Sequence, residues 1–130
     1  GPTLRTVILD AGFLISVDRG DEAARQLLTA INRSRTRLHT THAVVAQVWR
    51  DGANQARLAS FLKTTTIHPL DDGRAIGQLL ALSRTADVVD AHLVVLAVRL
   101  GDSILTGDPD DIEHIADTLG TSKPSVQPWP

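Results

Sequence analysis

The 130-residue sequence contains no cysteine and no methionine, and its only aromatic residues are two tryptophans and two phenylalanines. Without cysteine the chain forms no disulfide and has neither a thiolate metal ligand nor a cysteine nucleophile. It has no apolar run of the roughly 18 residues that a membrane span needs, and no secretory signal pattern. We therefore expect a cytoplasmic protein with no membrane partner.

The missing methionine also bears on the first residues, because a natural reading frame begins with Met and this sequence begins with Gly1 and Pro2. We interpret these two residues as a remnant of tag cleavage and expect one domain over residues 3–130. Hydrophobic residues make up 42% and charged residues 22% of the chain, as is typical of soluble globular proteins.

Apolar runs alternate with helical patterns along the chain. Strands are expected at residues 6–9, 37–40, 64–70, 102–106 and 125–127, and Pro128 should stop the last one. Helices are expected at 10–17, 21–32, from 41 to a break at 51–52, 54–63, from 71 or 72 to 83, 88–100 and 109–119. In the third helix, a buried stripe is expected from Val44, Val45, Val48 and Trp49. The alternation predicts an α/β fold with a parallel sheet.

Asp10 directly follows an apolar run, Val7 to Leu9, that suits a strand buried on both faces. Ligands of parallel sheets bind at the carboxyl ends of the strands, so Asp10 is a candidate site residue. The alternative is that Asp10 only caps the next helix, because Asp is a favoured N-cap.

Two further acids have positions that would let them meet Asp10. Asp108 follows the expected fourth strand, although an Asp before Pro109 is also an ordinary helix N-cap. Asp90 lies among apolar residues in the first turn of the helix at 88–100, and its alternative is a capping or surface role. Asp87 either shares a face with Asp90 or caps that helix.

Three carboxylates that are close together repel one another, so at neutral pH one would hold a proton unless a cation is present. Ligands with oxygen atoms only suit Mg²⁺ or Mn²⁺, and such ions assist the hydrolysis of phosphodiesters. The five histidines are dispersed and none has a zinc-site spacing: His39, His42, His68, His92 and His114.

Four motifs in this order resemble those of PIN-domain ribonucleases, and closely those of VapC-type toxins of bacterial toxin–antitoxin pairs. They are Leu9-Asp10, the segment 41–50 that ends in Gln47-Val48-Trp49-Arg50, Asp87-Val88-Val89-Asp90-Ala91-His92, and Thr106-Gly107-Asp108-Pro109-Asp110-Asp111. The resemblance implies a three-layer α/β/α fold with a roughly five-stranded parallel sheet. It also implies cleavage of tRNA or rRNA with Mg²⁺ or Mn²⁺, a homodimer, and a VapB-type antitoxin that covers the acidic pocket.

The resemblance implies specific roles for residues of this chain. Asp10, Asp90 and Asp108 would be catalytic acids and metal ligands, and Asp87 and Asp111 would be auxiliary acids. Thr106 would hold a substrate phosphate or a water, or else be a simple strand-end hydroxyl.

Arginines are the candidates for contacts with RNA phosphates, because the guanidinium group is a good fork for phosphate. The candidates are Arg33, Arg35, Arg37 and Arg50. A solvated loop is the alternative explanation for the first three.

Gln47 departs from the family, which usually has Glu at this position and would count it among the catalytic acids. Its amide oxygen is a weak metal ligand and cannot act as a carboxylate base. Gln47 is either a natural variation, an inactivating substitution made to spare an expression host, or a solvent-facing residue of an amphipathic helix.

The sequence therefore supports a metal-dependent endoribonuclease, or a binding module that kept the fold but lost turnover. A phosphatase of the haloacid-dehalogenase class also begins with a strand-end Asp. It needs a second Asp two residues later, where this chain has Gly12.

Overall fold

The structure is a computed structural model that describes residues 5–101 and 103–130, so Gly1 and Pro2 lie outside the described residues. Five parallel strands form one sheet in the order β3-β2-β1-β4-β5. The strands are β1 (Thr6–Leu9), β2 (Arg37–Thr41), β3 (Thr66–His68), β4 (Ser103–Thr106) and β5 (Val126–Pro128). This is the expected α/β fold with a parallel sheet.

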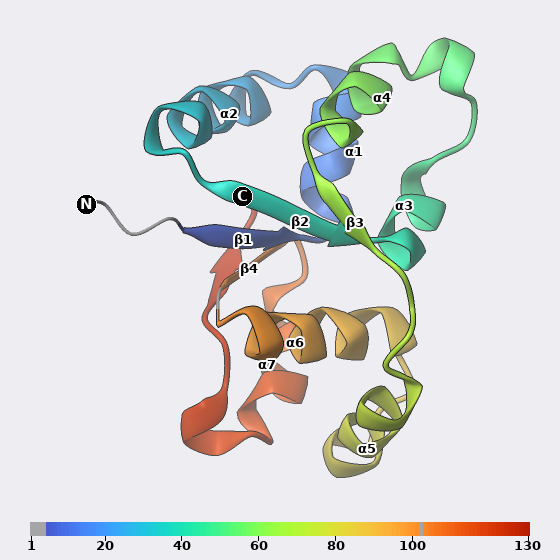
Figure 1. Ribbon diagram of the computed structural model, residues 1–130, viewed down its shortest axis with the longest axis vertical. Helices are drawn as coiled ribbons and strands as arrows, with labels where there is room; N and C mark the ends of the chain where they lie inside the picture. Colours follow the sequence, from blue (N-terminus) through green and yellow to red (C-terminus); the bar gives the residue numbers. More distant parts are fainter. Residues whose placement is uncertain (1–4, 102) are drawn as a thin grey trace.

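Helices cover both faces of the sheet and make three layers (Figure 1). One face carries α1 (Ala11–Arg19), α2 (Glu22–Ser34), α3 (His42–Val48) and α4 (Ala56–Leu62), with a 3₁₀ turn at Gly52–Asn54. The other carries α5 (Gly73–Ser83), α6 (Val88–Leu100) and α7 (Pro109–Asp117), and a second 3₁₀ turn follows at Gly120–Ser122. No helix among the described residues is long and apolar enough to cross a membrane.

The register of the central strands fixes where the chain presents polar groups. Leu9 of β1 pairs with Leu105 of β4, so the next residues, Asp10 and Thr106, emerge side by side at the carboxyl end of the sheet. Ile8 and Ile104 are fully buried in the core, as the apolar runs predict. The buried, paired residues of β1 and β4 therefore fix the positions of Asp10 and Thr106.

The helix boundaries follow local signals in several places. The Thr41 hydroxyl accepts from the backbone N–H of Val44, as expected for the N-cap of α3. Gly20 and Gly101 end α1 and α6 in the left-handed region, with φ of 72° and 75°. By contrast, Asp21 and Asp72 make no side-chain cap hydrogen bond at α2 and α5.

The expected end of the third helix was wrong, because α3 stops at Val48 and Trp49 is its extended C-cap. The reason is the side chain of Gln55, whose Oε1 accepts from the N–H groups of Arg50 and Asp51. Its Nε2 donates to the carbonyl of Val48, so the amide replaces the next helical turn. Trp49 consequently leaves the buried stripe and is 37% exposed.

Two more boundaries differ from the expectation. The expected strand at 64–70 is only Thr66–His68, because the N–H groups of Thr64 and Thr65 bond back to the end of α4. The expected helix at 54–63 divides into a 3₁₀ turn and α4.

Pro128 belongs to β5, contrary to the expectation that it ends the strand. The next N–H, that of Trp129, donates to the Thr106 carbonyl at 2.7 Å. Since alternate residues of a strand point their backbone groups to opposite sides, the nitrogen of Pro128 faces away from β4. The missing N–H of proline therefore costs the ladder no hydrogen bond.

Candidate functional site

Asp10 is held in a fixed position at the end of β1. Its backbone N–H donates to the Leu105 carbonyl at 3.0 Å, and only 7% of the residue is exposed. One carboxylate oxygen accepts from the N–H of Ala11 and the other from the Thr106 hydroxyl, both at 2.7 Å. Asp10 thus caps α1 and also occupies the strand-end position that ligands of parallel sheets use.

Thr106 joins the ends of β1 and β4 through one hydroxyl group. The hydroxyl donates to Asp10 and accepts from the N–H of Asp108 at 2.9 Å, and the residue is fully buried. Its only proton is therefore engaged by a carboxylate. This arrangement matches a strand-end hydroxyl that positions two acids, and the role of Thr106 in holding a substrate phosphate or a water stays a prediction.

Three carboxylates gather beside Asp10. One oxygen from each of Asp90, Asp108 and Asp111 lies within 4.8 Å of the other two. Asp108 precedes α7 and Asp111 lies in its first turn, so both project from the same helix end, whereas Asp90 comes from the first turn of α6. We call these three residues the acid cluster.

Asp111 is one of the three acids of the cluster, whereas the sequence suggested only an auxiliary acid. Its carboxyl group is hydrogen-bonded to that of Asp108 and raises the pKa of Asp108. The sequence signal was present, because Asp111 is three residues after Asp108 at a helix start, and such residues share a face.

Repulsion within the cluster is visible in the pKa of Asp90, which is raised to about 7. Burial is the largest cause, followed by the charges of Asp87, Asp10, Asp108 and Asp111. Asp10 is therefore close enough to act on Asp90, although it is outside the cluster of three. A bound divalent cation would remove this repulsion, and the all-oxygen donor set suits Mg²⁺ or Mn²⁺.

Asp87 serves the backbone of α6. One of its carboxylate oxygens accepts from the N–H of Asp90 at 3.0 Å, which makes Asp87 the N-cap of the helix that carries Asp90. The contacts of Asp87 are therefore those of a helix cap, which was one of the two alternatives for this residue.

Gln47 lies in the last turn of α3 and is exposed. Within residues 5–101 and 103–130 its side chain makes no hydrogen bond. Helix α3 follows β2 and packs against α1, so it begins at the same carboxyl edge as the acids. The role of Gln47 as a ligand stays a prediction.

The arginines do not gather at the acids. Arg33 lies in the last turn of α2, Arg35 is its C-cap and Arg37 begins β2, which places all three at the amino edge of the sheet, opposite the acid cluster. The sequence carried a signal for this, because residues that precede a strand lie at the edge where the strand begins. Arg50 follows α3, and its guanidinium donates to the carbonyls of Ala46 and Trp49.

Two histidines that the sequence shows as dispersed lie side by side on neighbouring strands. Nδ1 of His39 and Nε2 of His68 are 2.7 Å apart, and burial is the main cause of the lowered pKa of His68. His92 of α6 is buried with its Nδ1 unpartnered among the described residues, and burial lowers its pKa too. In the described chain, no histidine belongs to a group of three or more metal-ligating side chains.

No protein-family profile and no curated protein matches the sequence. Among solved structures, the chain is similar to the crystal structure of VapBC2 from Rickettsia felis bound to a DNA fragment from their promoter. The TM-score is 0.70 at 12% sequence identity, and the match covers 96% of this chain and 99% of that chain. The two chains therefore share a fold along nearly their whole length.

Proposed function

We propose that this protein is a VapC-type PIN-domain toxin, a metal-dependent endoribonuclease that cleaves tRNA or rRNA. The observation that carries the proposal is the acid cluster of Asp90, Asp108 and Asp111 beside the buried Asp10. It lies at the carboxyl end of a parallel sheet, on the fold shared with the Rickettsia felis structure. The four motifs of the resemblance contain all four of these acids.

The residues that would hold Mg²⁺ or Mn²⁺ are the acid cluster and Asp10. When bound, such an ion neutralises charge on the phosphodiester and lowers the pKa of water. Thr106 keeps Asp10 in place through the hydrogen bond between their side chains. Asp90, with a pKa of about 7, is the acid that gives up a proton near neutral pH when a cation enters.

The alternative function is a binding module without turnover, and Gln47 is the observation that favours it. An amide at this position brings no negative charge and no general base to the carboxyl edge. If catalysis needs that carboxylate, the chain binds RNA or antitoxin and cleaves nothing.

Cleavage of a broad RNA pool with and without Mn²⁺ tests both functions. The variants are the chain itself, Gln47→Glu, and Asp90→Asn as the inactive control. Cleavage that depends on Mn²⁺ and is lost in Asp90→Asn supports the nuclease, and activity of Gln47→Glu alone identifies a disabled active site. Cleavage by neither the chain nor Gln47→Glu contradicts the nuclease and favours the binding module.

A VapB-type antitoxin, a homodimer and a cytoplasmic location belong to the same proposal. An arginine of the antitoxin would pair with the acids at the carboxyl edge by a bidentate contact. Substituting Asp10, Asp90 and Asp108 together by Asn should then weaken antitoxin binding, and unchanged affinity contradicts this contact. Sedimentation equilibrium measures whether the chain is a dimer.

A further inference from the structure

A hollow of about 940 Å³ opens at the amino edge of β1, β4 and β5, away from the acid cluster. Leu27 and Ile31 of α2 line one side of it. Val7 and Leu105 of the sheet and Trp129 after β5 also line it, as do the end of α6 and the segment 122–125. Nothing in the proposed chemistry at the acids uses this surface.

One residue of the lining lies beside the strand end that precedes Asp108. Trp129 lines the hollow, and the backbone N–H of the same residue donates to the carbonyl of Thr106, next to Gly107 and Asp108. A four-residue strand is about 13 Å long. A few nucleotides of extended RNA would therefore reach from the amino edge to the acids.

Exposed arginines lie at or near the mouth of the hollow: Arg5 lines it, and Arg33, Arg35 and Arg37 lie outside its lining. The carbonyl of Arg5 accepts from the N–H of Arg37 at 2.7 Å, so these two residues are neighbours. Arg33 lies in the last turn of α2, and Arg35 is the C-cap of that helix, two residues before Arg37. All four arginines are exposed, and none forms an ion pair with another described residue.

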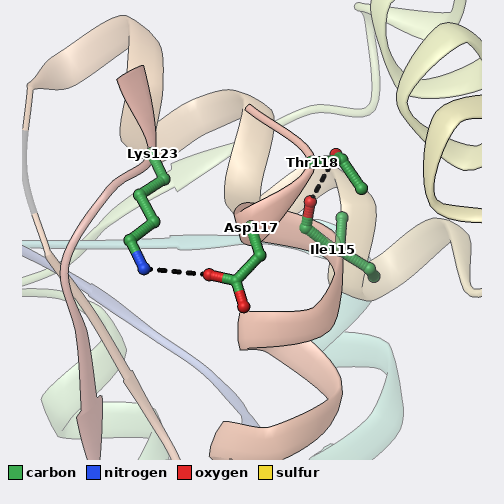
Figure 2. Close-up of polar contacts among 4 residues, drawn as sticks. All are labelled: Ile115, Asp117, Thr118 and Lys123. Carbon is green, nitrogen blue, oxygen red and sulfur yellow. Dashed lines mark hydrogen bonds and ion pairs between the residues drawn. The ribbon is translucent and has the colours of Figure 1, made fainter. Parts of the chain in front are cut away.

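Lys123 also lines the hollow but is already paired. Figure 2 shows its Nζ directed at the carboxylate of Asp117, and the two atoms are 2.9 Å apart. The cations available to a ligand at this edge are therefore the arginines.

The backbone at Arg35 adds an independent observation. Its φ is 54°, in the left-handed region where helices usually end with glycine. A side chain with a Cβ is strained there, and the guanidinium contacts no partner in the described chain that would offset the strain.

We propose that the hollow and the arginines at its mouth bind a single-stranded segment of RNA that flanks the bond to be cleaved. The arginines fit phosphates, and the apolar lining with Trp129 fits unstacked bases. The inference rests on the proposed function for the identity of the polyanion, and it assigns substrate binding to the edge of the sheet opposite the acid cluster.

The first test measures binding of a fluorescently labelled, mixed-sequence single-stranded RNA by anisotropy in EDTA, so that cleavage plays no part. Arg5→Gln with Arg37→Gln is compared with Arg19→Gln with Arg74→Gln, two exposed, unpaired arginines that do not line the hollow. We expect weaker binding only for the first pair. Its salt dependence should be shallower by about 1.4, which is about 0.7 for each phosphate that an arginine no longer neutralises.

The second test fills the hollow without changing charge. Ala30 of α2 is exposed and lines the hollow, whereas Ala23 of the same helix is exposed and does not. Ala30→Trp should weaken RNA binding by about tenfold, comparable to the stacking of one base. Ala23→Trp should leave the affinity unchanged.

Equal effects in a test variant and its control, or no effect in either, overturn the inference. Loss of a dimer in Arg5→Gln with Arg37→Gln, with unchanged RNA affinity, also overturns it and makes this edge an interface between copies. Because cleavage is not measured, selective weakening upholds RNA binding here even if the acids fail to cleave.

Discussion

The hydroxyl group of Thr106 links Asp10, at the end of β1, to Asp108, after β4, by two hydrogen bonds. Replacing Thr106 by Val keeps the shape but leaves the buried oxygen of Asp10 without its hydroxyl donor. We expect Thr106→Val to lower the free energy of unfolding by about 1–3 kcal/mol. Urea denaturation measures this, and Thr106→Ser, which keeps the hydroxyl, is the control. Equal losses in the two variants would mean that the hydrogen bond contributes nothing.

Asp90 should make the stability of the protein depend on pH. Its pKa is about 7 in the folded protein, raised from 3.8, so the folded state binds more protons than the unfolded state between these values. Stability should therefore fall as pH rises from about 4 to about 7. After allowance for solvent screening of this partly exposed group, the loss is on the order of 1 kcal/mol.

The control for this pH effect is Asp90→Asn, which cannot titrate. Thermal unfolding in EDTA between pH 4 and pH 8 should show a smaller decline for Asp90→Asn than for the unchanged chain. Parallel profiles would show that Asp90 titrates normally.

At the residue scale the sequence predicts which acids follow buried strands, but it does not predict the direction in which their side chains point. Asp10 and Asp108 were placed by the apolar runs before them, and their neighbouring positions follow from the strand order. The inclusion of Asp111 in the cluster depends on the rotation of α7. The inward direction of the Thr106 hydroxyl depends on which strand face is buried.

Elements whose signals are local were predicted well. The strand at residues 6–9 and the helix at 88–100 have the expected bounds, because an apolar run and a glycine C-cap lie within the element itself. Helix α3 ends early because of Gln55, which lies outside it. A side chain that replaces a helical turn leaves no periodic signal in the sequence.

The left-handed helix ends at Arg35 and Arg84 lead to a paired prediction. Both residues are C-caps with positive φ, of 54° and 56°. Arg35→Gly and Arg84→Gly should each raise the free energy of unfolding by up to about 1 kcal/mol. Chemical denaturation measures the gain, and only Arg35→Gly should also weaken RNA binding. A loss of RNA affinity in both variants, or in neither, would contradict the role given to Arg35.

Over the whole molecule, a net charge of −2 conceals two edges of opposite sign. Acids lie where the central strands end, and arginines lie where β1 and β2 begin. The sequence put Arg33, Arg35 and Arg37 with the RNA-binding residues but did not separate them from the acids. The separation between these arginines and the acids becomes clear only once strand direction is combined with strand order.

Cation binding should stabilise the folded chain more strongly at pH 8 than at pH 5. At pH 5 a proton on Asp90 competes with the ion, and at pH 8 it has left. A concentration of Mn²⁺ about 100 times its dissociation constant adds about 2.7 kcal/mol. Differential scanning calorimetry measures the shift, and Asp90→Asn with Asp108→Asn should abolish it. A shift of the same size at both pH values would place the ion elsewhere.

The proline in β5 has a consequence for how copies of this protein can associate. The outer side of an edge strand normally offers a row of N–H groups, on which another chain can lay a strand. Here that row is interrupted, because the nitrogen of Pro128 faces outward and carries no hydrogen. Sheets from neighbouring molecules therefore cannot join along β5 into a continuous ribbon, which guards the protein against fibrous self-assembly from this side. Strand pairing between two copies is therefore disfavoured along β5, whereas the opposite edge strand, β3, contains no proline.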